Sequence, residues 1–129
     1  MATPDIEQLL ASVPTGLWIG GEERPGASTF DVLNPATGEV LTSIANAGAA
    51  DAIAALDAAS AVEAEWAATP GRERGEILRS VFEKIIARAD DFATLMTLEM
   101  GKVLAESMGE VKYGAEFFRW FAEEAARIH

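Results

Sequence analysis

The pattern of apolar and polar positions changes near residue 50. Before that point, short β-prone runs alternate with turns that contain glycine and proline, whereas from residue 51 onward apolar residues recur at helical spacing. Four of the five prolines lie in residues 1–50, and most of the alanine lies beyond them. The pattern therefore predicts an α+β chain in which two short antiparallel β-hairpins are followed by about four α-helices.

Each predicted hairpin is marked by its turn. The first joins Leu17–Ile19 to the residues after Gly20-Gly21, a dipeptide that accepts the positive φ values of tight turns. The second joins 29–33 to 39–44 through Asn34-Pro35-Ala36-Thr37-Gly38. Hairpins this short are marginally stable alone, so we expect them to lie against helices or to pair with other strands.

Capping residues divide the second part of the chain into helices. The first helix covers 51–68, and the second starts at Thr69-Pro70, where a hydroxyl N-cap precedes a proline in the first helical position. Asp90-Asp91 caps the third helix, which ends at Gly101. The fourth helix runs over 104–127.

The fourth helix is apolar on two sides. One stripe has the spacing of a packed seam and consists of Leu104, Met108, Val111, Ala115, Phe118 and Ala122. Four aromatic residues lie off that stripe: Tyr113, Phe117, Trp120 and Phe121. Because small monomers rarely leave such a patch exposed, we expect a partner, a longer chain or a second copy in a homo-oligomer to cover it.

Composition and charge narrow the function classes. The chain has 129 residues, a formal net charge of −11 and no cysteine. This charge repels nucleic acids and anionic membranes, and the lack of cysteine excludes disulfides and a thiol nucleophile within these residues. The start of the chain resembles neither a signal peptide nor a transit peptide, and no apolar run is long enough for a membrane span, so a cytoplasmic location is expected.

Few residues indicate a catalytic or binding role on their own. The single histidine, His129, is the last residue and reads as a surface residue without metal or catalytic partners. No glycine-rich phosphate-binding motif occurs, and the glycines at 20, 21 and 38 suit turns. Adjacent carboxylates such as Asp90 and Asp91 point about 100° apart on a helix, so they cannot share one proton.

Five segments resemble the NAD(P)-dependent aldehyde dehydrogenase superfamily. They read LWIGGE at 17–22, VLNPATGEV at 32–40, TPGRER at 69–74, LEMGK at 98–102 and FRWFAEEA at 118–125. The last segment is similar in particular to the succinate-semialdehyde dehydrogenase branch. The resemblance covers 15–129 and implies the amino-terminal portion of a much longer enzyme.

That resemblance implies a single incomplete unit over 1–129. Residues 1–50 would form a hairpin arm, and 51–129 would form the helical portion of the cofactor-binding domain. In the family a cysteine thiolate attacks the aldehyde, hydride passes to the nicotinamide of NAD or NADP, and a glutamate activates water. With no cysteine here, no catalytic or cofactor-binding residue is transferred, and the chain alone is expected to be inactive and to bind no cofactor.

Two weaker site assignments follow from the resemblance. Gly109, Tyr113 and Phe117 match positions at the substrate entrance, although Phe117 could instead pack against the cofactor domain. Some members also hold a monovalent cation with a carboxylate at the position of Glu99 and backbone oxygens near Val32 and Leu33. The alternative for Glu99 is a solvated carboxylate at a helix end.

Three functions stay open at this point. The chain could be part of a succinate-semialdehyde dehydrogenase, which oxidises succinate semialdehyde to succinate, or part of an aldehyde dehydrogenase with another small aldehyde substrate. It could also be a self-associating helical interaction module that uses the aromatic residues of 113–121. The choice between NAD and NADP is not visible, because the residues that read the ribose follow a strand that these residues lack.

Overall fold

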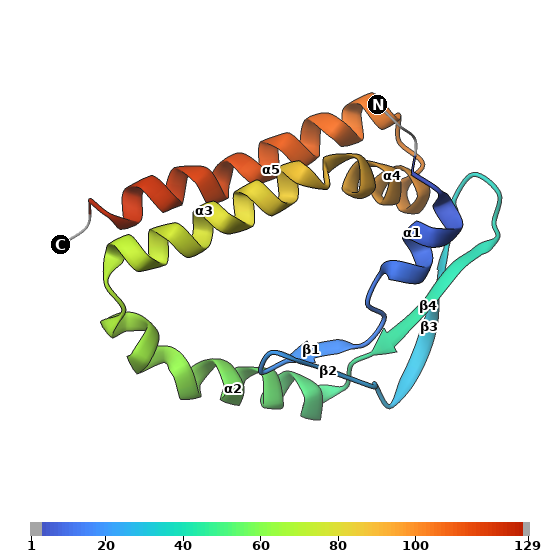
Figure 1. The fold of residues 1–129 in the computed structure, drawn as a ribbon. Coiled ribbons are helices and arrows are strands. Elements are labelled where there is room, and N and C mark those ends of the chain that lie inside the picture. The colour runs from blue at the N-terminus through green and yellow to red at the C-terminus, as the bar shows by residue number, and fades with distance from the viewer. Residues whose placement is uncertain (1–3, 128–129) are drawn as a thin grey trace. The chain divides into compact units, whose positions relative to one another are not determined.

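The computed structural model describes residues 4–127 and separates the chain into two compact units (Figure 1). One unit is Ile6–Ala68. Among the described residues, the other consists of Pro4, Asp5 and residues 69–127. Each unit is described by itself below.

The first unit, Ile6–Ala68, contains the two predicted hairpins. Strands β1 and β2 pair antiparallel, as do β3 and β4, and Gly20, Gly21 and Gly38 adopt positive φ values of 64°, 82° and 76° in or beside the turns. A short helix that the sequence pattern did not predict precedes them. The elements are α1 (Ile6–Ser12), β1 (Leu17–Ile19), β2 (Glu22–Arg24), β3 (Ser28–Leu33), β4 (Val40–Asn46) and α2 (Ala49–Ala68).

Helix α2 has a capped N-terminus, but its side chains are not buried. The backbone N–H of Gly48 donates to the Asp51 carboxylate at 2.8 Å, which satisfies one of the free donors at the helix start. The helix contacts β1, yet none of its residues is buried. Its large apolar side chains, Ile53, Leu56, Val62 and Trp66, are all exposed.

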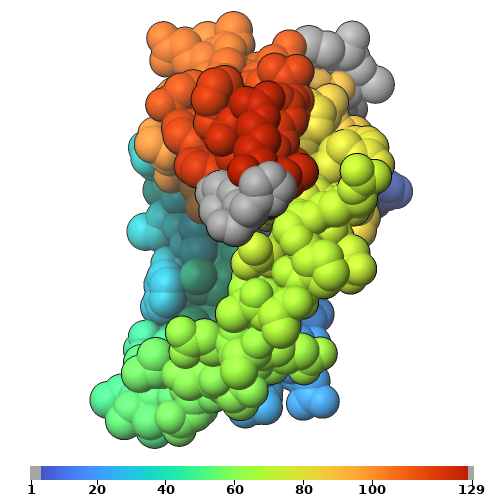
Figure 2. Space-filling view, turned by 90° about the vertical axis from the view of Figure 1, so that its left-hand side faces the viewer, coloured from blue at the N-terminus to red at the C-terminus, as the bar shows by residue number. Residues whose placement is uncertain are grey.

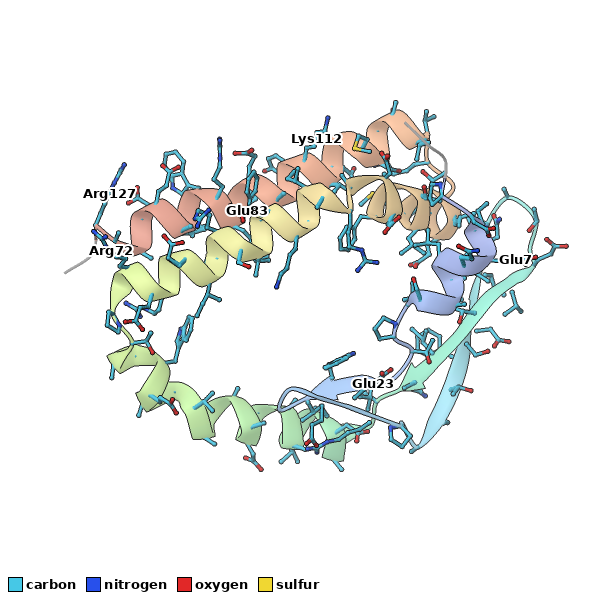
Figure 3. The ribbon with its side chains drawn as sticks, in the orientation of Figure 1. Glu7, Glu23, Arg72, Glu83, Lys112 and Arg127 are labelled. Carbon is cyan, nitrogen blue, oxygen red and sulfur yellow. The ribbon has the colours of Figure 1, made fainter. Side chains whose placement is uncertain are left out.

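The second unit is a helical layer formed by α3 (Gly71–Ala87), α4 (Ala89–Met100) and α5 (Leu104–Ala125). Helices α3 and α5 run antiparallel along each other, and α4 packs against α5 (Figure 1). Arg72 at the start of α3 and Arg127 beyond the end of α5 consequently lie at the same end of the pair (Figure 3). This direction also sets the positive end of the α3 dipole beside the negative end of α5.

Two glycines let α3 and α5 approach closely. A Cβ added to Gly75 would lie 2.6 Å from the carbonyl oxygen of Ala122, and one added to Gly71 would collide with the carbonyl oxygen of Ala125. Any larger residue would push the two backbones apart. The spacing of four residues places both glycines on one side of α3.

A small buried layer joins α4 to α5. Ala93, Thr94, Ser107, Val111 and Ala115 are buried, and the Thr97 and Ser107 hydroxyls lie 2.9 Å apart in a hydrogen bond between the two helices. Val111 and Ala115 are thus buried as the seam pattern predicted.

The rest of the seam is less covered than the pattern predicted. Leu104 and Phe118 each keep 37% of their surface exposed.

The helix ends lie within two residues of the predicted ones, but the predicted cap of α4 at Asp90-Asp91 is wrong, because the N-cap is Arg88 and no side chain caps the helix. Gly101 ends α4 in the left-handed conformation at φ 73°, and Asp90 and Asp91 lie in the first turn of that helix. The predicted start of α3 is wrong by one residue, because Gly71 is the first helical residue and Pro70 takes the N-cap position, where no side chain caps the helix. Within residues 4–127, no helix combines the length and the apolar character that crossing a membrane requires.

Candidate functional site

The most distinctive surface of the second unit lies on α5, and we call it the aromatic face: Tyr113, Phe117, Trp120 and Phe121. Tyr113 is 68% exposed, Trp120 63%, Phe121 55% and Phe117 47%. At 100° per residue, Tyr113, Phe117 and Trp120 point away from the side that buries Val111 and Ala115. Figure 2 shows the surface of α5 in orange and red beside the yellow and green surface of α3.

The rings of the aromatic face form two open hollows. Tyr113 and Phe117 meet edge to face with ring centroids 5.1 Å apart, a favourable geometry for aromatic pairs. A hollow of about 350 Å³ is lined by the aromatic face and Glu116. A second, of about 280 Å³, lies where Leu78 of α3 meets Phe117, Phe118 and Phe121. Both hollows suit an apolar occupant.

The three residues predicted for a substrate entrance lie together. Gly109, Tyr113 and Phe117 are four residues apart, so they form one stripe along α5. Nothing lies within 4 Å of the position that a Cβ on Gly109 would take, so a side chain at this end of the stripe would meet no neighbouring residue. Their role at an entrance stays a prediction.

The predicted cation site is spread over both units. Glu99 is exposed in α4, one residue before the end of the helix, whereas Val32 and Leu33 belong to β3. Among residues 4–127, no group of three or more histidine, aspartate or glutamate side chains is placed to hold a metal ion. The cation assignment stays a prediction, and His129 lies outside the described residues.

A third hollow, between α3 and α5, is rich in arginine, but most of that charge is neutralised. It is lined by Arg72, Gly75, Glu76, Arg79, Arg119, Ala122, Glu123 and Ala126. The hydrogen bond to Glu76, together with the charges of Glu76 and Glu83, raises the pKa of Arg79. Arg119 pairs with Glu116 at 2.6 Å and lies 5.8 Å from the Phe82 ring. The hollow offers little net attraction for an anion.

The family model described as "Aldehyde dehydrogenase family" matches residues 21–129, which is most of the chain. The chain belongs to the aldehyde dehydrogenase family. This finding confirms the predicted family.

The curated relatives of this aldehyde dehydrogenase chain include semialdehyde dehydrogenases. It is 58% identical over 88 residues to a succinate-semialdehyde dehydrogenase of Paenarthrobacter nicotinovorans, covering 68% of this chain and 20% of that protein. It is 43% identical over 114 residues to a glutarate-semialdehyde dehydrogenase of Pseudomonas aeruginosa, covering 88% of this chain and 23% of that protein. The resemblance to the succinate-semialdehyde branch is thereby confirmed.

Solved structures confirm the fold. An Escherichia coli protein described as an NADP-dependent enzyme matches with a TM-score of 0.88 and 42% identity, covering 95% of this chain and 25% of that one. This aldehyde dehydrogenase chain therefore spans about a fifth to a quarter of the length of the relatives it matches.

Sequence reasoning missed two contacts that hold the α5 surface in place. The hydrogen bond between Thr97 and Ser107 joins residues that no motif marks. The close approach at Gly71 and Gly75 did have a signal, because two glycines four residues apart at a helix start are typical of closely packed helices. Both contacts fix α5 and hence the aromatic face.

Proposed function

We propose that this chain is the amino-terminal portion of an NAD(P)-dependent succinate-semialdehyde dehydrogenase, which oxidises succinate semialdehyde to succinate. The observation that carries the proposal is the identity to the Paenarthrobacter relative, which is higher than to the glutarate-semialdehyde relative. The chain's own part in such an enzyme is to supply a helical layer and an arm with two hairpins. In the whole enzyme, residues 1–50 would be a hairpin arm and residues 51–129 the helical portion of the cofactor-binding domain.

The residues described here do not fit a dinucleotide site. Among residues 4–127, both sheets are two-stranded and antiparallel, whereas the Rossmann-type site needs parallel strands that lead into a helix through a glycine-rich turn. We therefore assign NAD(P) binding, the thiol nucleophile and the water-activating glutamate to residues outside this chain.

The stripe of Gly109, Tyr113 and Phe117 is proposed to border the substrate entrance of the whole enzyme. Its support is the exposed, continuous arrangement of the three residues and the open space at Gly109. A glycine at the start of the stripe leaves room for a small, flexible aldehyde. A bulky residue there, as in Gly109→Trp, should raise KM for the aldehyde more than it lowers kcat.

The first test measures the chain alone. Purified residues 1–129 should reduce neither NAD nor NADP in the presence of succinate semialdehyde and should show no saturable heat of cofactor binding in calorimetry. Turnover by the pure chain would contradict the proposal, because it would require a nucleophile other than cysteine.

The second test restores the missing part. Residues 1–129 are fused to the portion of the Paenarthrobacter enzyme that follows the matched region, and the fusion is assayed with succinate and glutarate semialdehydes and with both cofactors. A higher kcat/KM for succinate semialdehyde is expected. A preference for glutarate semialdehyde would favour the second candidate substrate, which the Pseudomonas relative supports.

Three further predictions belong to the same proposal. A cytoplasmic location can be checked by cell fractionation. Homo-oligomerisation through the aromatic face, which the sequence led us to expect, is the alternative to the docking surface proposed below, and sedimentation of the free chain distinguishes the two. A monovalent cation at Glu99 should make the thermal stability of the active fusion depend on potassium, and Glu99→Gln should remove that dependence.

A further inference from the structure

The chain exposes more surface than its mass requires. Its accessible surface is 9043 Å². A compact monomer of 13.7 kDa would expose about 6,600 Å², and even two separate globules of half that mass would together expose about 8,000 Å². The surplus of about 1,000 Å² or more equals or exceeds the roughly 800 Å² that each partner buries in a standard interface. A sizeable part of this surface is therefore built to be covered.

The aromatic face is a concentrated part of that surface. Phe117, Trp120 and Phe121 are about half or more exposed and lie within two turns of one rigid helix. Aromatic residues held on a rigid element are the usual anchors of protein interfaces, because they bury a large area at little cost in entropy. The hollow between them leaves space for a side chain of a partner.

Charge disfavours a second copy of this chain as the occupant. Each copy carries a formal net charge of −11, so pairing brings two strongly acidic surfaces together. The one charged residue that lines the larger hollow is Glu116. A two-fold arrangement centred on this face would bring Glu116 of both copies near each other. An occupant that is neutral or basic at its rim fits better.

We propose that Phe117, Trp120 and Phe121 form the docking surface for the remaining part of an aldehyde dehydrogenase polypeptide, supplied in cis or as a separate chain. The proposal rests on the proposed function in so far as the partner belongs to the same family. Between three quarters and four fifths of the length of these relatives lies outside the part that this chain matches. The chain also keeps the fold of the larger proteins over almost its whole length.

The absence of cysteine allows a direct test of docking. Trp120→Cys introduces the single thiol of the chain into the aromatic face, and Ala105→Cys introduces one on the same helix two turns before the face. Each variant is co-expressed with the portion of the Paenarthrobacter enzyme that follows the matched region, and also fused to it. Thiol labelling is read from the mass of residues 1–129 or of the peptide that contains the thiol, so cysteines of the partner do not interfere.

Docking should slow the labelling of Trp120→Cys at least tenfold relative to the free chain and should leave Ala105→Cys within a factor of two. A matched pair of charge variants, Trp120→Glu and Ala105→Glu, should respectively abolish and preserve co-purification of the two parts. Equal labelling rates in the assembled and free chain would overturn the proposal. Failure of both the co-expressed pair and the fusion to assemble would also overturn it.

Two other outcomes are informative. Protection of Trp120→Cys in the free chain that grows with its concentration, together with a dimer in sedimentation, would assign the face to a second copy and overturn the proposal. Protection in the assembled protein without succinate-semialdehyde oxidation would leave the docking surface intact and contradict only the proposed activity. The two proposals can therefore fail separately.

Discussion

Gly75 is a residue at which the helical unit leaves no room for a larger side chain. Gly75→Ala places a methyl group 2.6 Å from the carbonyl oxygen of Ala122, and the α3–α5 pair must separate to accept it. We expect the free energy of unfolding to fall by about 2 kcal/mol, measured by urea denaturation followed by helical circular dichroism.

Gly114 provides the matched control. It lies inside α5, and an added Cβ there meets nothing within 4 Å. Gly114→Ala should stabilise the unit by about 0.5–1 kcal/mol, because alanine is the better helix former. Similar losses of stability in both variants would show that α3 and α5 are not in close contact at Gly75.

Ser107 holds α4 and α5 in register through one part-buried hydrogen bond. It is fully buried, and its hydroxyl lies 2.9 Å from that of Thr97. Ser107→Ala leaves the Thr97 hydroxyl without this partner, so we expect a loss of about 1–2 kcal/mol in urea unfolding. If the bond is responsible, the loss should be much smaller when Thr97→Val is already present.

At the scale of the element, Gly101 determines where α4 ends. Its φ of 73° is reached easily by glycine and costs alanine roughly 1–2 kcal/mol. Gly101→Ala should therefore lower stability by about 1 kcal/mol, since alanine also restricts the unfolded chain. Gly101→Asn should lose less, because asparagine tolerates this conformation. Equal losses from the two variants would contradict this role.

The positions of the helices and strands were more predictable from the sequence than which of their residues are buried. The turn residues Gly20-Gly21 and 34–38 marked both hairpins, and Gly101 marked the end of α4, because these signals act within a few residues. Helix α1 carries no such periodic pattern in its seven residues and was missed. Periodicity showed which side of α5 is apolar, but it could not show that Phe118 stays partly exposed, since coverage depends on residues distant in sequence.

At the scale of the whole molecule, most large apolar side chains remain outside the core. Among the described residues, the buried apolar ones are Leu9, Ile19, Ala93, Val111 and Ala115. We expect the free chain to increase the fluorescence of an apolar dye such as ANS well above the level of a compact monomer of the same mass. Assembly with the remaining aldehyde dehydrogenase polypeptide should suppress that signal. If the free chain does not increase the fluorescence of the dye, the apolar side chains are not exposed in solution as they are in the structure.

The order of α3, α4 and α5 along the chain has a consequence for biosynthesis. Each of these helices packs against helices that are close to it in sequence, so the unit needs no distant segment in order to fold. It can take shape at the ribosome once residue 125 has emerged, before most of the later part of an aldehyde dehydrogenase is made. The aromatic side chains of α5 would then be exposed on the nascent chain until the rest of the polypeptide arrives.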